Sequence, residues 1–320
     1  MRVLVTGCCG FIGSHLAEYL QAMGHDVVGL DRLDETASLG YGPRSLVLHD
    51  LQFPIGTGLG LLELQKTFDW VCHLAAFSHV DRSVRDPLQA IKDNVVGTAN
   101  LLEWARRNPP RKFLYFSTDE VFGPAEDGEQ FSAWDRLLPK NPYAASKAAA
   151  EVMLPAWAST YGLPIVVTHC TNVYGPRQHP EKLIPLVVRQ IRNGATVQVH
   201  VRDTQVASRK WVHVSDVCRA VLAILERGGV MMGAHSGRYN ISADEEVSVD
   251  DVVRGIGEQL GIAPRMEAVE DPPGRPRPDM RYDLDDEPTR QLGWKPQVAF
   301  ALGLKETVLW YLEHDPARAA

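Results

Sequence analysis

The sequence lacks an apolar run of the roughly 18 residues that a membrane-spanning helix requires. Strand-like sequence begins at Arg2, so the start of the chain does not have the pattern of a signal peptide. Positive charge is not in excess either, because 33 Lys and Arg stand against 40 Asp and Glu, a formal net charge of −7. We therefore expect neither a membrane nor a nucleic acid as a partner.

Cysteine is scarce, and the sequence contains no internal repeat or low-complexity tract. The five cysteines are Cys8, Cys9, Cys72, Cys170 and Cys218. Their number is odd, and they lack the CxxC or Cys/His spacing of a metal site. We expect no bound metal and mostly buried thiols, in a reducing compartment such as the cytoplasm.

A glycine-rich turn follows the first strand-like segment. Residues 2–5 form a short, mainly apolar strand-like segment, and Gly7, Gly10 and Gly13 follow it. Glycines at this spacing allow a tight turn, a close approach of the backbone to a pyrophosphate, and packing of the following helix. The phosphates would then rest on the N-terminus of that helix. The pattern predicts a dinucleotide-binding site.

The second predicted strand, residues 26–30, ends at Asp31. An acidic residue about 20 positions after the glycines suits a ribose 2′-hydroxyl and repels a 2′-phosphate, which favours NAD over NADP. Arg32 makes that preference moderate, because an arginine can accept a phosphate.

Strand and helix patterns alternate through the first half of the chain. Further strands are expected at 45–51, 69–76, 112–116 and 164–170, and helices at 87–107 and 143–161. This alternation predicts an α/β fold with a doubly wound parallel sheet. We expect a kink or break at Pro155, a loop at 171–176, a further loop at 271–278, and a smaller domain made mainly from the C-terminal third. His73 reads as a core histidine.

Polar side chains follow the strand at 112–116, in the order Ser117, Thr118, Asp119 and Glu120. Parallel strands place ligand chemistry just beyond their carboxyl ends, so these side chains should face a ligand. Two adjacent carboxylates at the end of a buried strand cost folding free energy unless each has a partner or they serve in binding or catalysis.

Tyr143 and Lys147 lie four residues apart in a predicted helix, with Pro142 suited to its first turn. An ammonium near a phenol favours the phenolate, so we expect Lys147 to lower the pKa of Tyr143. Such a phenolate could take a proton from an alcohol while hydride leaves the same carbon.

With these elements in place, the chain resembles an extended short-chain dehydrogenase/reductase, and most of all the dTDP-glucose 4,6-dehydratases. The matching segments are HLAAFSHVDRS (73–83), NVVGT (94–98), STDEVFG (117–123), NPYAASKAA (141–149), NVYGPRQHPEKLIP (172–185), SRKWVHVSDV (208–217) and RPRPDMRY (275–282). The Asp119–Glu120 doublet is the most specific, because related epimerases and decarboxylases usually lack it.

The resemblance implies a role for each of the five catalytic candidates, which are Thr118, Asp119, Glu120, Tyr143 and Lys147. Tyr143 would deprotonate the sugar 4-hydroxyl, Thr118 would hydrogen-bond that oxygen, and Lys147 would hold the nicotinamide ribose. Glu120 would remove the proton from carbon 5, and Asp119 would protonate the departing 6-hydroxyl.

The resemblance also implies a Rossmann-type fold, a homodimer joined through the helices near 90–107 and 143–161, and two domains. Residues 1–172, with roughly 211–238, would bind NAD, while 173–210 and 239–320 would bind the nucleotide-sugar. The expected cofactor contacts are Gly7, Gly10, Phe11, Ile12, Gly13, Asp31, Asp50, Leu51, Leu74, Ala75, Ala76, Ser117, Tyr143 and Lys147. The expected substrate contacts are Ser78, Asn172, Glu181, Lys182, Leu183, Arg209, Asn240 and Arg275.

Several positions depart from the family pattern. Cys8 and Cys9 stand where small residues are usual, and Phe77 replaces a common Glu. The glycine-rich turn before Arg209 is also missing. The alternatives that stay open are a 4-epimerase, a decarboxylase, a 5,6-dehydratase and a non-catalytic NAD-sensing scaffold. The carboxylate pair speaks against the first two, and retention of Tyr143 and Lys147 speaks against the last.

Overall fold

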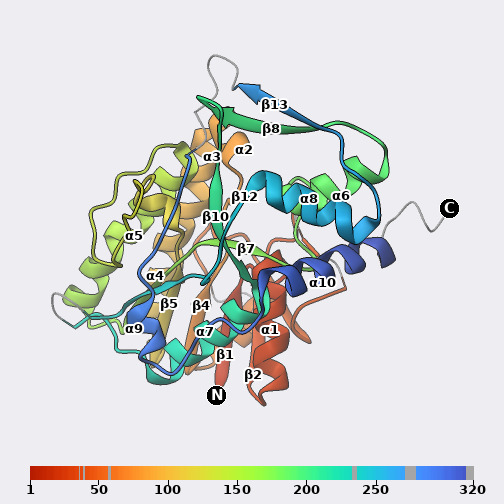
Figure 1. Cartoon of the computed structure of the whole chain (residues 1–320). Coiled ribbons are helices and arrows are strands. Elements are labelled where there is room, and N and C mark those ends of the chain that lie inside the picture. The colour runs from red at the N-terminus through yellow and green to blue at the C-terminus, as the bar shows by residue number, and fades with distance from the viewer. Residues whose placement is uncertain (36, 39, 57–58, 233–235, 271–278, 315–320) are drawn as a thin grey trace.

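A seven-stranded parallel sheet forms the centre of the molecule (Figure 1). The computed structural model describes residues 1–320 except 36, 39, 57–58, 233–235, 271–278 and 315–320. The strand order is β11-β6-β5-β4-β1-β2-β3. Its strands are β1 (Arg2–Thr6), β2 (Asp26–Asp31), β3 (Ser45–Leu48), β4 (Trp70–His73), β5 (Lys112–Phe116), β6 (Ile165–Cys170) and β11 (Arg238–Ile241). The predicted doubly wound α/β sheet is confirmed.

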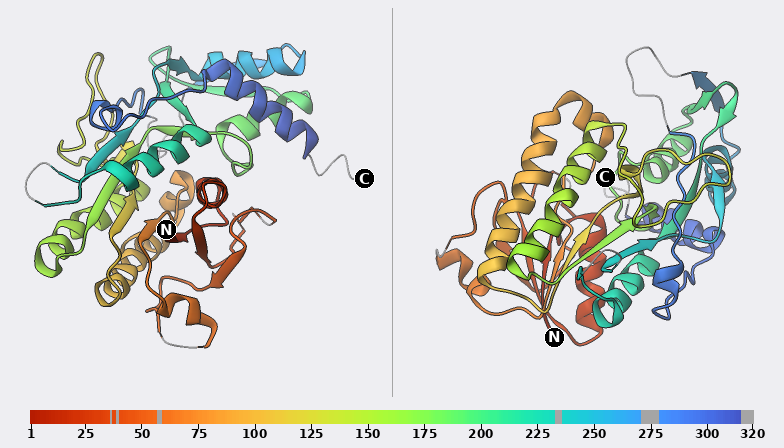
Figure 2. Two further views of the ribbon diagram at one scale, coloured as in Figure 1. Left: turned by 90° about the horizontal axis from the view of Figure 1, so that it is seen from below. Right: turned by 90° about the vertical axis from the view of Figure 1, so that its left-hand side faces the viewer.

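Helices cover both faces of this sheet, as the right-hand view of Figure 2 shows. On one face, α1 (Phe11–Ala22) packs against α7 (Val214–Arg227). On the other, α4 (Gly97–Arg107) packs against α5 (Pro142–Tyr161). The faces bury separate apolar clusters because β-strand side chains alternate between the two sides of a sheet.

The segment predicted as one helix at 87–107 consists of three helical parts. These are α3 (Pro87–Ile91), the π-helical turn η2 (Lys92–Val96) and α4. A π-turn inserts one residue into the helical repeat and often marks a functional position. Here the turn carries Asp93 and Asn94, and both side chains bond residues outside it.

Pro155 does not end helix α5, which runs unbroken from Pro142 to Tyr161. Of the kink or break that we expected there, the break does not occur. Pro155 has no backbone N–H to donate to the carbonyl of Glu151 four residues earlier, so the helix continues past it with one hydrogen bond fewer. The predicted loop at 171–176 is also partly wrong, because Asn172–Tyr174 forms strand β7, paired in parallel with β10 (Ser208–His213).

A second layer of helices and two small sheets lies beside the carboxyl end of the central sheet (Figure 1). Helices α6 (Leu183–Arg192), α8 (Val249–Leu260) and α10 (Phe300–Glu313) share one apolar cluster there. The small sheets are β12-β10-β7 and β13-β8-β9, with β8 at Val197–Arg202, β9 at Gln205–Val206, β12 at Glu246–Ser248 and β13 at Met266–Glu270. The short helices are α2 (Val80–Arg85), α9 (Glu287–Arg290), η1 (Leu59–Gln65) and η3 (Asp119–Val121). In the described part of the chain, no helix combines the length and apolar character needed to cross a membrane.

Candidate active site

A cavity of about 340 Å³ lies at the carboxyl end of the central sheet. All fourteen predicted cofactor contacts line it, from the glycine turn at Gly7 to Lys147 on α5. The five candidate catalytic residues line the same cavity. The tertiary structure thus gathers residues from β1, β2, β4, β5 and α5, because the carboxyl ends of parallel strands meet at one edge of the sheet.

The glycine turn leaves no room for side chains. Gly7 has a φ of +66°, and a Cβ on it would lie 2.7 Å from the backbone nitrogen of Ala75. A Cβ on Gly13 would lie only 2.0 Å from the backbone oxygen of Gly7. The turn leads straight into α1, whose N-cap is Gly10. Bare backbone at the start of a 12-residue helix is suited to the pyrophosphate of a dinucleotide.

Acidic side chains surround the predicted ribose position. One carboxylate oxygen of Asp31 accepts a hydrogen bond from the Cys9 backbone, 2.9 Å away. Arg32 donates to both oxygens of Asp93, at 2.7 and 2.9 Å, and to Asp34 at 2.8 and 3.1 Å. Arg32, the residue that could have bound a 2′-phosphate, is therefore already paired with the carboxylates of Asp34 and Asp93. A phosphate here would face Asp31, Asp34 and Asp93, which supports the preference for NAD.

Thr118 organises the polar turn after β5. It is the N-cap of η3, and its hydroxyl oxygen accepts from the backbone nitrogen of Glu120 at 3.4 Å. The same hydroxyl donates to Oδ1 of Asp119, 3.1 Å away. Asp119 is only 4% exposed, and its Oδ2 has no hydrogen-bond partner among the described residues. A buried carboxyl oxygen without a partner is more stable when the group is protonated.

The two neighbouring carboxyl groups are shifted in the same direction. Burial raises the pKa of Asp119 to about 7, and the negative charge of Glu120 adds to the shift. Burial also raises the pKa of Glu120, while a hydrogen bond from Asn141 and the charge of Lys182 oppose the rise. Asp119 can therefore hold a proton near neutral pH, beside a second carboxyl whose own rise in pKa is opposed by Asn141 and Lys182.

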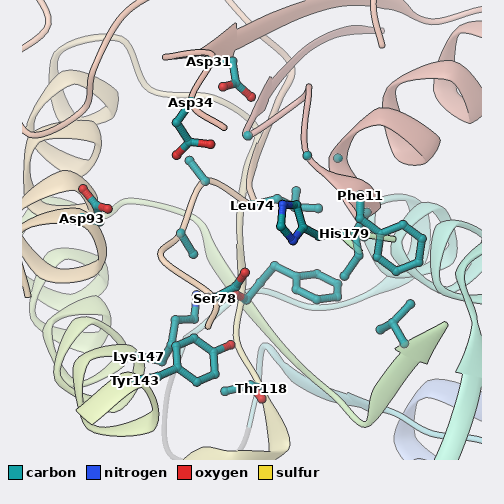
Figure 3. Close-up of a pocket in the computed structure, with 18 of the residues that line it drawn as sticks. Phe11, Asp31, Asp34, Leu74, Ser78, Asp93, Thr118, Tyr143, Lys147 and His179 are labelled. Carbon is teal, nitrogen blue, oxygen red and sulfur yellow. Dashed lines mark hydrogen bonds between the residues drawn. The ribbon is translucent and has the colours of Figure 1, made fainter. Parts of the chain in front are cut away.

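Tyr143 and Lys147 project from the first turns of α5, with Thr118 facing them from the end of β5 (Figure 3). Lys147 Nζ donates to the backbone oxygen of Phe116 at 2.6 Å and lies 4.2 Å from the centre of the Tyr115 ring. These contacts fix the ammonium group against β5.

The predicted lowering of the Tyr143 pKa does not occur in this structure. Burial and the negative charge of Glu120 raise this pKa, and a hydrogen bond with Thr118 opposes the rise. Burial lowers the pKa of Lys147 to about 7, so its positive charge is itself weakened. The prediction considered one attractive charge and left out desolvation, which is larger for fully enclosed groups.

Four of the predicted substrate contacts line the cavity, namely Ser78, Asn172, Glu181 and Lys182. Leu183 begins α6 and does not line it. Arg209 also lies outside the lining, where it donates to the backbone oxygens of Ser208, Met280 and Asp279. Its charge nevertheless lowers the pKa values of both Asp119 and Glu120. Arg275 lies outside the described residues.

Asn240 is placed in the interior, not at the cavity. It is fully buried, and its amide nitrogen donates to the backbone oxygens of Phe131 and Asp285. Its amide oxygen faces His169 at 3.1 Å. These bonds occupy the side chain, so we leave Asn240 out of the substrate contacts proposed below.

His73 lies below the cavity floor, as predicted for a core residue. It is 1% exposed and lies between the hydroxyls of Thr6, at 2.7 Å, and Thr98, at 3.0 Å. Burial lowers its pKa to about 3, so it stays neutral.

Sequence analysis missed several residues that line the cavity: His49, Asp93, Thr171, Gln178 and His179. Asp93 immediately precedes the NVVGT segment, and Gln178 and His179 fall within NVYGPRQHPEKLIP. Their closeness to these matched segments was the available signal, but spacing alone does not say which side of a loop faces inward.

Comparison with known proteins agrees with this geometry. The sequence model of the NAD dependent epimerase/dehydratase family matches residues 3–242. A dTDP-glucose 4,6-dehydratase of Streptomyces niveus is 37% identical, over 98% of this chain and 94% of that protein. A solved dTDP-glucose 4,6-dehydratase of Streptomyces venezuelae, with NAD and TYD bound, has a TM-score of 0.84 and 36% identity, covering 98% of each chain. A UDP-glucose 4-epimerase of Thermus thermophilus in complex with NAD has a TM-score of 0.86 and 32% identity, covering 98% of this chain and 100% of that one.

Proposed function

Because the chain belongs to the NAD dependent epimerase/dehydratase family, we propose that it is an NAD-dependent nucleotide-diphosphate hexose 4,6-dehydratase. Epimerases and dehydratases share this fold, so the fold does not choose between them. The observation that carries the choice is the carboxyl pair Asp119–Glu120, which lines the same cavity as Tyr143. An epimerase has no water to eliminate and so needs no second acid beside the tyrosine.

When bound, NAD supplies the redox chemistry, accepting a hydride from carbon 4 of the sugar and giving it back to carbon 6. The glycine turn and Asp31 fit this cofactor. Tyr143 takes the proton of the 4-hydroxyl, and Thr118 hydrogen-bonds the same oxygen. Thr118 opposes the rise in the pKa of Tyr143, which favours the phenolate that this step requires.

Elimination follows from the 4-ketone. A carboxylate cannot remove a proton beside a plain alcohol, but the ketone makes the proton on carbon 5 acidic. Glu120 takes that proton, and Asp119 gives its own to the leaving 6-hydroxyl, so water departs. The arrangement needs one charged and one protonated carboxyl, and a pKa of about 7 for Asp119 meets the second requirement.

The substrate that we propose is dTDP-glucose or UDP-glucose, converted to a 4-keto-6-deoxy sugar. Ser78, Asn172, Glu181 and Lys182 would contact it within the cavity. We also keep three substrate contacts that only the family resemblance supports, namely Leu183, Arg209 and Arg275. For the domains, we propose NAD binding by residues 1–172 with roughly 211–238, and nucleotide-sugar binding by 173–210 and 239–320.

We also propose a homodimer in the cytoplasm. Helix α5 exposes an apolar stripe at Ala145, Ala149, Val152 and Ala156, spaced at helical intervals. Leu88 on the adjoining α3 is also exposed. Such a stripe on packed helices suits a second copy of the chain.

The reaction is tested by supplying dTDP-glucose or UDP-glucose deuterated at carbon 4, with NAD in catalytic amount. We expect a 4-keto-6-deoxy product carrying the label at carbon 6, and no net formation of NADH, read by mass spectrometry and NMR. Recovery of the label at carbon 4 of an epimer would identify a 4-epimerase instead. Loss of the label to solvent would also contradict the proposal.

A further inference from the structure

Glu120 is held by a side chain that no role has yet been given. The amide nitrogen of Asn141 donates to Oε2 of Glu120 at 2.7 Å. Asn141 stands at the end of the long connection between η3 and α5, directly before Pro142. It therefore joins the segment that carries the two carboxyl groups to the helix that carries Tyr143 and Lys147.

The orientation of the Asn141 amide is fixed by the helix that it caps. Its Oδ1 accepts the backbone N–H of Ala144 at 2.8 Å, as the N-cap of α5. A backbone N–H can only donate, so the atom facing it must be the amide oxygen. The amide nitrogen is then directed at Glu120, where it can only donate. Exchanging the two atoms would break both bonds at once.

We propose that Asn141 is a positioning residue that aims Glu120 at carbon 5 of the sugar and favours the charged form of its carboxyl group. The inference rests on the proposed function, because it assigns Asn141 a part in the proton removal by Glu120. A donor that faces one carboxylate oxygen leaves the other oxygen available as the base. It also limits rotation of a side chain that has three rotatable bonds.

Other charged and titratable groups surround Glu120 and act on it together with Asn141. Lys182 and Arg209 favour its charged form, and Asp279 opposes it. Its charge is in turn felt by three neighbouring acids, Asp119, Tyr143 and Tyr282. Asn141 differs from all of these because it is neutral, so its effect does not vary with pH.

Three substitutions separate helix capping from positioning. Asn141→Ser and Asn141→Asp both keep a good N-cap, whereas Asn141→Ala removes it. The serine hydroxyl is too short to serve the cap and Glu120 together. The aspartate keeps the cap but places a carboxylate, which cannot donate, opposite Glu120.

For Asn141→Ser we expect kcat to fall about 10- to 100-fold, which reaches at most the lower limit of the range for losing the base itself, with KM nearly unchanged. The acidic limb of the kcat–pH profile should move to higher pH. The reason is that the charged form of Glu120 loses a hydrogen-bond donor, which raises its pKa. Asn141→Asp should move this limb to a still higher pH, because the new carboxylate repels the charge of Glu120. Single-turnover mixing should show bound NADH accumulating, because oxidation precedes the impaired step, and we expect the same of Glu120→Gln. The melting temperature of Asn141→Ser should stay close to that of the wild type, whereas those of Asn141→Ala and Asn141→Asp should be lower, through loss of the cap and through like-charge repulsion.

Wild-type kcat and an unshifted pH profile in Asn141→Ser would overturn the inference. So would activity losses that follow the melting temperature across the three variants, since this would leave only a capping role. If the wild-type protein itself fails to transfer label from carbon 4 to carbon 6, the proposed function is wrong, and the role of Asn141 falls with it.

Discussion

Asp119 and Glu120 are neighbours in the chain, yet their side chains meet different surroundings. Asp119 is enclosed, and one of its oxygens has no hydrogen-bond partner among the described residues. Glu120 accepts from Asn141 and feels the charge of Lys182. The difference suits the opposite parts that we propose for these two carboxyl groups of similar intrinsic acidity.

The raised pKa of Asp119 predicts how stability depends on pH. Its pKa is about 7 in the folded protein against an ordinary value of 3.8, so between these values the folded state holds a proton that the unfolded chain has lost. The free energy of unfolding should therefore fall as pH rises from about 4 to 7, by up to about 4 kcal/mol at 1.36 kcal/mol per unit. In Asp119→Asn this part of the decline should disappear. Chemical denaturation of both proteins across this pH range measures it, and equal slopes would show that Asp119 titrates normally.

The residue scale also shows where sequence reasoning fell short. The pairing of Tyr143 with Lys147 on one helix face followed directly from their spacing. The direction of the Tyr143 pKa did not, because it depends on burial and on Glu120, which lies 23 residues earlier. Spacing determines which residues share a helix face, but desolvation depends on everything packed around them.

At the scale of elements, the glycine turn and α1 act as one unit. The backbone of Gly7 lies against Gly13 on one side and Ala75 on the other. The turn is therefore held between its own helix and the loop after β4. Backbone atoms surround the turn, and unlike side chains they cannot change rotamer to admit an added Cβ.

Gly13→Ala should distort this turn. The new Cβ would lie 2.0 Å from the Gly7 oxygen, and backbone must shift to admit it. We expect the free energy of unfolding to fall by about 1–3 kcal/mol, as for other overpacked sites, and NAD affinity to fall at least tenfold (roughly 1.4 kcal/mol). Calorimetric titration with NAD and a melting curve measure these effects.

Gly60→Ala is the matched control for this substitution. Apart from its own helical segment, no described residue comes within 4 Å of a Cβ built on Gly60, and its φ is not positive. Its stability and NAD affinity should stay close to those of the wild type. Wild-type NAD affinity in Gly13→Ala would show that the turn does not cradle the cofactor.

At the scale of the whole molecule, the described residues leave one face of α5 exposed. Val152 is 66% exposed in the middle of the apolar stripe, although α5 buries its other side beneath α4. An apolar side chain so exposed on a central helix is accounted for if a second copy covers it.

Val152→Glu should separate the two copies, because a charge buried without a partner is costly. We expect the wild type to sediment as a dimer and the variant to dissociate at least 100-fold more readily (roughly 2.8 kcal/mol). Leu302→Glu is the control, since Leu302 is 68% exposed on α10. That variant should remain dimeric. A Val152→Glu protein that sediments like the wild type would place the interface elsewhere.

The sequence by itself determined the sheet and the cofactor turn, and it singled out Tyr143 and Lys147 as candidate catalytic residues. These depend on local patterns: alternation of strands and helices, three glycines before a helix, and a tyrosine four residues from a lysine. The tertiary structure decided what depends on distant segments meeting. In the folded chain Arg32 donates to Asp93 and Asn141 donates to Glu120. Asn240 is bonded in the interior. Local patterns follow from the backbone geometry of a few consecutive residues, whereas these contacts exist only once strands and helices far apart in the chain have packed.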